Sequence, residues 1–148
     1  MRRDPSVIPT FERIQVGQSL PELRKTVTVE QIRAYAEASG DRNPIHLDEV
    51  FARSVGLPGV IAHGMLTMAF AAQLVTDWLG DRRRVTGFHG RFSGMVRPGD
   101  ELRCTGTVAA KDADARRLTV EVRVENQKGE KVFNKGVAEV DFTKQEEN

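Results

Sequence analysis

The sequence predicts an α+β fold in which a long antiparallel sheet wraps around one buried helix. Residues 65–79 are apolar around most of a helical circumference, which is typical of a buried helix. After Gly80, four segments alternate apolar and polar residues with period two, which indicates strands with one buried face. Short turn signals join these segments, and short connections favour antiparallel pairing.

A strand and two helices are expected ahead of the apolar stretch. Residues 23–27 form the strand. Thr28 caps the helix that follows, with Gln31 as its reciprocal partner in a capping box, and Gly40 ends that helix. A second, short helix is expected over residues 47–55.

The remaining strands are expected over residues 85–96, 101–111, 116–126 and 131–142. Residues 118–125 show the alternation most clearly, with Leu and Val on one face and polar side chains on the other. Residues 97–100 and 127–130 carry the turn signals. Consecutive strands joined by such short turns imply an antiparallel sheet.

The length of 148 residues predicts one domain over residues 1–148, because such a chain buries one core and is short for two. Residues 1–9 contain two prolines and are expected to form an arm, and residues 144–148 form a polar tail. Neither end is expected to carry chemistry.

Composition excludes several kinds of partner. With 22 Lys+Arg, 21 Asp+Glu and a net charge of +1, there is no overall field to attract nucleic acid or an anionic membrane. No apolar run has the length of a membrane span, and no secretory signal is expected. Cys104 is the single cysteine, which excludes an internal disulfide and a multi-cysteine metal site. A cytoplasmic location is expected.

The most informative stretch is the run SGDRNPIH at residues 39–46. Pro44 disfavours the helical region for Asn43, so we expect an ordered loop here. Such a loop can turn Asp41 and His46 toward one point, where a base and an acid meet a water molecule or a substrate proton. Asn43 can hold the loop or the water through its amide.

The alternative is that Asp41 and Asn43 supply turn chemistry only and that His46 packs in the core. Short motifs of this kind often arise by chance. A second element, IAHGM at residues 61–65, follows closely and contains His63. Together the two runs favour an active site.

Both runs resemble the motif of the MaoC-like (R)-specific enoyl-thioester hydratases, which have the hot-dog fold, and in particular the catalytic-subunit type of (3R)-hydroxyacyl-acyl carrier protein dehydratases. The resemblance is dense over residues 35–70. It implies reversible hydration of a trans-2-enoyl thioester of CoA or acyl carrier protein to the (3R)-3-hydroxyacyl thioester. No cofactor is expected, because nicotinamide, flavin and metal motifs are absent from the sequence.

By this resemblance, Asp41 and His46 hold the water and divide the roles of base and acid, in an order that the sequence leaves open. Gly64 resembles the position whose backbone N–H polarises the thioester carbonyl, and a helix start suits an enolate oxygen. Close packing is the alternative role for Gly64. Asn43 is expected to orient the loop, and His63 to be a structural neighbour.

Further candidates concern substrate binding. An acyl tunnel is expected beside the buried helix, with Phe70, Phe88, Phe92 and Met95 as lining residues, although ordinary core packing is the alternative for each. Basic residues that can receive the phosphates or acidic surface of a thioester carrier are Arg82, Arg83, Arg84, Arg91 and Arg97. Solvated surface is the alternative for them.

Hot-dog proteins pair or carry two fused copies, so the resemblance implies a homodimer or a heterodimer with a related hot-dog subunit. The chain would then be the catalytic half of such a heterodimer. Three other functions stay open: a hot-dog thioesterase, a non-catalytic acyl-binding subunit and a binding module with a vestigial site. A thioesterase would carry an acid on the central helix, where residues 68–73 have none, and a non-catalytic subunit would lack the Asp/His pair.

Overall fold

The computed structural model describes residues 8–144, so most of the expected arm and tail lies outside the described residues. Its elements in chain order are η2 (Phe11–Arg13), β1 (Leu23–Thr26), α1 (Val29–Ser39), α2 (Pro44–Leu47), α3 (Glu49–Ser54), α4 (Gly64–Leu79), η3 (Arg82–Arg84), β2 (Val85–Phe92), β3 (Glu101–Asp112), β4 (Arg117–Glu125) and β5 (Lys131–Asp141). Within residues 8–144, every helix is too short or too polar to cross a membrane.

The five strands form one antiparallel sheet in the order β1-β3-β4-β5-β2. This confirms the α+β class and the neighbouring pairs β3–β4 and β4–β5. The turn at residues 97–100 does not make neighbours of β2 and β3, because β2 pairs with β5 at the edge of the sheet and β3 lies between β1 and β4. The strand expected over 85–96 ends earlier, at Phe92. Beyond it the chain leaves the sheet, and the carbonyl of Val96 accepts a hydrogen bond from the amide of Ala62. Val96 is thereby buried beside the segment that leads into α4.

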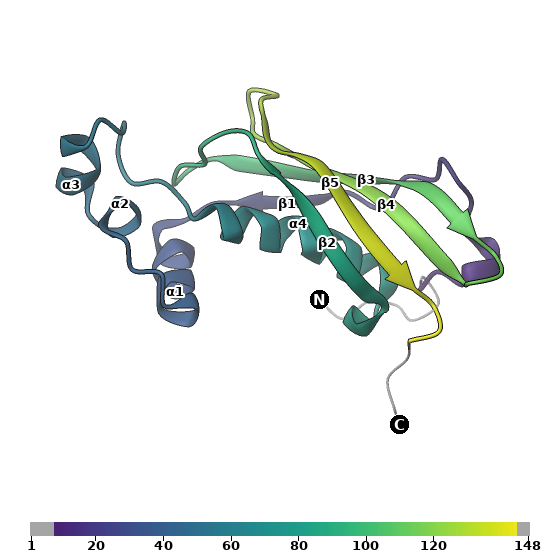
Figure 1. Cartoon of the computed structure of the whole chain (residues 1–148). Helices are drawn as coiled ribbons and strands as arrows, with labels where there is room; N and C mark the ends of the chain where they lie inside the picture. Colours follow the sequence, from purple (N-terminus) through teal and green to yellow (C-terminus); the bar gives the residue numbers. More distant parts are fainter. Residues whose placement is uncertain (1–7, 145–148) are drawn as a thin grey trace.

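Helix α4 runs along one face of the sheet (Figure 1). Its residues Ala71, Leu74 and Val75 are buried. A Cβ on Gly106 in β3 would lie 3.2 Å from Leu74, so this glycine lets the helix approach the sheet closely. Burial of the helix is one-sided, because Met65 is 53% exposed. The sheet covers one side of the helix only, which corrects the expectation of an apolar helix buried all round.

Helices α1, α2 and α3 stand beyond the end of the sheet where α4 begins (Figure 1). The predicted capping box of α1 is present, because the Thr28 hydroxyl accepts from the Gln31 amide and the Gln31 side chain accepts from the Thr28 amide. Gly40 ends the helix in the left-handed region, with φ +78°. These local signals place the start of the 39–46 run at a helix end.

The helix expected over 47–55 and the loop expected over 39–46 are both corrected. Asn43 is non-helical, as Pro44 requires, but Pro44 occupies the first position of α2 and His46 lies on that helix. Asp48 is also non-helical, and its side chain accepts from the Phe51 amide to cap α3. The helical segment is therefore split in two at Asp48, and only its first part carries a motif residue.

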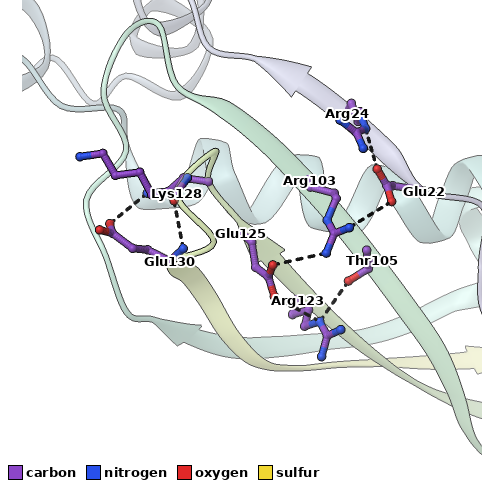
Figure 2. A network of polar contacts seen from close by, with 9 residues as sticks. Glu22, Arg24, Arg103, Thr105, Arg123, Glu125, Lys128 and Glu130 are labelled. Carbon is purple, nitrogen blue, oxygen red and sulfur yellow. Dashed lines mark hydrogen bonds and ion pairs between the residues drawn. The ribbon is translucent and has the colours of Figure 1, made fainter.

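The other face of the sheet is polar, and Figure 2 shows ion pairs that cross its strands. Arg103 on β3 lies 3.8 Å from Glu22 and 3.4 Å from Glu125 on β4. Arg123 lies 3.6 Å from the same Glu125. Ion pairs of this kind on a protein surface contribute little stability, and their charged groups keep this face of the sheet hydrated. A cavity of about 660 Å³ opens on this face, and none of the 39–46 residues lines it.

Candidate active site

The Asp41 segment is built from turns that its own side chains make. The Ser39 hydroxyl accepts from the Asp41 amide at 3.2 Å, and Asp41 Oδ1 accepts from the Asn43 amide at 3.2 Å. Asn43 Oδ1 in turn accepts from the Ile45 amide at 3.2 Å and so caps α2. Turn chemistry is therefore present, as the alternative interpretation expected, but it occupies only one oxygen of the Asp41 carboxylate.

The other oxygen, Asp41 Oδ2, lies 4.0 Å from His46 Nε2. His46 is 9% exposed, and its Nδ1 lies 2.7 Å from the carbonyl oxygen of Ile61. Because a carbonyl only accepts, Nδ1 carries the proton in this contact. In the neutral ring Nε2 then presents a lone pair toward Asp41. The backbone carbonyl of Ile61 was missed from the sequence, since a backbone group leaves no residue-type signal.

The 4.0 Å separation exceeds a direct hydrogen bond. One oxygen atom can lie within about 2.8 Å of both groups at this spacing. Asp41 is exposed, with 55% of its side chain accessible, while His46 is almost covered. The pair therefore opens to solvent on the carboxylate side and can share one water molecule or one substrate hydroxyl.

Gly64 is the first residue of α4, a helix of 16 residues. Within the described residues, the Gly64 and Met65 amides have no hydrogen-bond acceptor, and the His63 side chain does not cap the helix. Free N–H groups at the positive end of a helix dipole attract a negatively charged oxygen. Gly64 itself is exposed. The geometry provides the donors that an enolate would need.

A metal ion is a further possibility that the structure raises, because ligand atoms of Asp41, His46 and His63 lie within 4.8 Å of one another. His46 and His63 are separated in the sequence but adjacent in the fold. Their rings stack at 3.8 Å with an interplanar angle of 25°. Ring lone pairs lie in the ring plane, so two stacked rings direct them along nearly parallel planes rather than toward one ion. The absence of a metal remains a prediction.

The aromatic candidates occupy two different environments. Phe92 is 53% exposed and lies against Gly64, where a Cβ would approach its ring to 3.2 Å. Met95 is also exposed, at 54%. Phe70 belongs to the buried core, and Phe88 stacks on a core phenylalanine. Phe92 is therefore the candidate that the structure brings to the start of α4, and the tunnel role of the others remains a prediction.

The basic candidates are also divided. Arg84 lies in η3, beyond the far end of α4, where it stacks on Phe142 at 4.4 Å and lies 3.9 Å from Asp81. A 16-residue helix is roughly 24 Å long, so the structure does not bring Arg84 to the Asp41–His46 pair. Arg91 is exposed on β2, next to Phe92. A role in carrier binding remains a prediction for both.

The five-stranded antiparallel sheet that packs on one side of α4 is the hot-dog architecture. A family model, "MaoC like domain", matches residues 13–130, and the chain belongs to this MaoC-like hydratase and dehydratase family.

Solved relatives have the same fold. The chain is 30% identical to the (R)-hydratase from A. caviae involved in PHA biosynthesis, with a TM-score of 0.81 over 88% of this chain and 98% of that one. It is 32% identical to R-hydratase PhaJ1 from Pseudomonas aeruginosa, with a TM-score of 0.80 over 88% and 83%.

Curated relatives include much longer proteins. The fatty acid synthase subunit beta of Gibberella zeae is 37% identical over 133 residues, which are 88% of this chain and 6% of that protein. Enoyl-CoA hydratase ChsH3 of Mycobacterium tuberculosis is 40% identical over 65 residues, which are 43% of this chain and 23% of that protein. The chain thus spans a small part of these relatives.

Proposed function

We propose that this protein catalyses the reversible hydration of trans-2-enoyl thioesters to (3R)-3-hydroxyacyl thioesters. The observation that carries the proposal is the 4.0 Å separation of Asp41 Oδ2 and His46 Nε2, two acceptors that one water molecule can contact together. The names of the solved relatives, which are (R)-hydratases, support the same class of reaction.

The reaction adds one water molecule across a double bond. The water oxygen bonds to the β carbon, the π electrons move onto the thioester carbonyl as an enolate, and the α carbon then takes a proton. With the proton of His46 on Nδ1, both Nε2 and the Asp41 carboxylate accept from the water. The group that removes the proton from the water afterwards holds a proton for the α carbon. One pair therefore serves both steps, with no net change in the enzyme.

The enolate oxygen is proposed to bind at the amide of Gly64. That N–H has no acceptor within the described residues, and it lies at the positive end of the α4 dipole. A donor of this kind acts only when negative charge develops, so it lowers the barrier more than it tightens substrate binding. Removal of such a donor costs roughly 10²–10³-fold in kcat.

The substrate is proposed to be a thioester of CoA or of acyl carrier protein, in a cytoplasmic setting. The similarity to fungal fatty acid synthase subunit beta favours fatty acid metabolism, and the similarity to ChsH3 favours a CoA thioester. The two carriers are distinguished by assay with each form of the same acyl group. The working assembly is proposed to be a homodimer, or a heterodimer with a related hot-dog subunit.

The purified chain should be tested with crotonyl-CoA and longer trans-2-enoyl-CoA homologues. Hydration removes the ultraviolet absorbance of the conjugated enoyl thioester and releases no free thiol. A thiol reagent in a parallel reaction therefore separates hydration from thioester hydrolysis. Loss of conjugation without thiol release is expected. Thiol release in step with the absorbance change would identify a thioesterase instead, and no change with any enoyl thioester, alone or with a partner subunit, would refute the proposal.

A further inference from the structure

His63 contacts each part of the candidate site. It is 2% exposed, and its Nε2 lies 2.9 Å from the backbone carbonyl oxygen of Asp41. Its ring stacks on His46 at 3.8 Å. Its own carbonyl accepts from the Leu66 and Thr67 amides, so the same residue begins α4. One residue therefore joins the Asp41 segment and the His46 imidazole through its side chain, and the helix start through its backbone.

The two nitrogens of His63 have different environments. Because the Asp41 carbonyl only accepts, Nε2 carries the proton and donates. The other nitrogen, Nδ1, is buried and has no hydrogen-bond partner within residues 8–144. A buried acceptor without a donor is unfavourable, and an apolar ring of the same size would avoid that cost. The contribution of a histidine at this position is therefore its Nε2–H.

The His63 bond is the long-range link that holds Asp41. The other hydrogen bonds of Asp41 involve Ser39 and Asn43, each two residues away, and both are exposed. The bond to His63 is partly buried and spans 22 residues. Local turns set the shape of the segment, but they do not fix where it lies relative to His46. The hydrogen bond from His63, on the buried side of the site, fixes the position of the segment relative to His46.

We propose that His63 is a positioning residue whose Nε2–H holds the Asp41 backbone, so that the Asp41 carboxylate faces His46 Nε2. This inference rests on the proposed function of the Asp41–His46 pair. His63 contacts the pair and not the reacting atoms, so its loss should lower kcat and leave KM close to the wild-type value. Misplacement of a reacting group by about 1 Å can cost about 10²-fold in rate.

Three variants separate the donor from the ring. In His63→Gln, the amide nitrogen reaches as far from the backbone as Nε2 does, so the donor is retained. In His63→Asn, the matched control, the amide stops near the position of Nδ1. In His63→Phe, the ring is retained without a donor. We expect His63→Asn and His63→Phe to lower kcat by up to about 10²-fold. His63→Gln should restore most of that loss.

Other outcomes would overturn the proposal. These are wild-type kcat in His63→Asn and His63→Phe, equal losses in all three variants, or a raised KM with unchanged kcat. Hydrogen exchange at the Asn43 amide, which donates to Asp41, gives a readout without substrate. It should be faster in His63→Asn than in His63→Gln, and equal rates contradict positioning. If His63→Phe fails to fold, the Gln and Asn pair still decides. A wild-type chain that is inactive both alone and with a related hot-dog subunit would refute the proposed function and leave the exchange comparison valid.

Discussion

A Cβ atom on Gly64 would lie 3.2 Å from Cδ1 of Phe92, a ring that is half exposed at the end of β2. The contact joins the first residue of α4 to the edge strand of the sheet, two positions far apart in the chain. The glycine thus serves close packing, and the same residue presents a free amide. The two roles suggested by the sequence are compatible.

Gly64→Ala is expected to lower kcat at least about tenfold, because the added methyl displaces Phe92 and the helix start by a few tenths of an ångström. Stability should change by no more than about 1 kcal/mol, because the contact is too tight by only a few tenths of an ångström. The double variant Gly64→Ala/Phe92→Ala relieves the contact and should regain part of the activity. Steady-state kinetics and thermal unfolding measure both effects. No gain in the double variant would contradict the steric explanation.

Asp41→Asn and His46→Ala are expected to lower kcat by roughly 10²–10⁴-fold, as removal of general acid–base groups does. Asp41→Asn keeps the oxygen that accepts from Asn43, so the turn should survive. Asp48→Asn is the matched control, because Asp48 is a helix-capping carboxylate two residues beyond His46. Its kcat should equal that of wild type. Circular dichroism should show folded variants, and wild-type rates in both dyad variants would refute the assignment.

The hydration product is expected to be the (3R)-3-hydroxyacyl thioester. The Asp41–His46 pair and the Gly64 amide are held on fixed elements, so water can attack one face of a bound enoyl group. Chiral chromatography of the product, or coupling to an (R)-specific dehydrogenase, measures the configuration. A (3S) or racemic product would contradict the prediction and show that this chain does not share the stereochemistry of its (R)-hydratase relatives.

Light scattering is expected to give a mass of about twice the 16.5 kDa of the chain, or more. Strand β2 is an edge of the sheet, and Met65, Phe92 and Met95 are each more than half exposed. Edges and apolar side chains of this kind are usually covered by a partner.

Two other results would contradict the homodimer prediction. An inactive monomer that gains activity with a related hot-dog protein lacking the dyad would be the catalytic half of a heterodimer, so the homodimer prediction would fail and the chemistry would stand. A fully active monomer would refute the assembly argument.

Cys104 is expected to resist thiol reagents in the folded protein. It is fully buried, and burial raises the pKa of its thiol to about 12. The pKa of an exposed thiol is 9.0, so Cys104 keeps its proton up to a higher pH in the folded protein than in the unfolded chain. Stability from this group is therefore complete below about pH 9 and falls as the pH rises further.

The Cys104 prediction has two measurements. A colorimetric thiol reagent should label one cysteine per chain in denaturant and almost none in the native protein. Urea unfolding should show a smaller alkaline loss of stability in Cys104→Ala than in wild type. Rapid native labelling would show that the core opens around β3.

Much of the fold could be predicted because its signals are local. The capping box of Thr28 and Gln31 acts within one helical turn, and Gly40 ends α1 through its own backbone conformation. The period-two pattern of β4 reports a buried face whatever the partner strands are. The prediction was wrong where two local signals competed. The sequence predicted one continuous helix over residues 47–55, but Asp48 is non-helical and its side chain caps α3.

The sequence by itself determined the residue types of the candidate site, because Asp41, Asn43, Pro44 and His46 lie within one short run. Tertiary structure decided their chemistry. The carbonyl of Ile61 sets the tautomer of His46, the His63 side chain donates to the carbonyl of Asp41, and the Phe92 ring packs against Gly64. Each of these contacts joins segments that local preferences do not relate. Their geometry depends on how α4 packs against the sheet, and that packing is settled only when the whole core is formed.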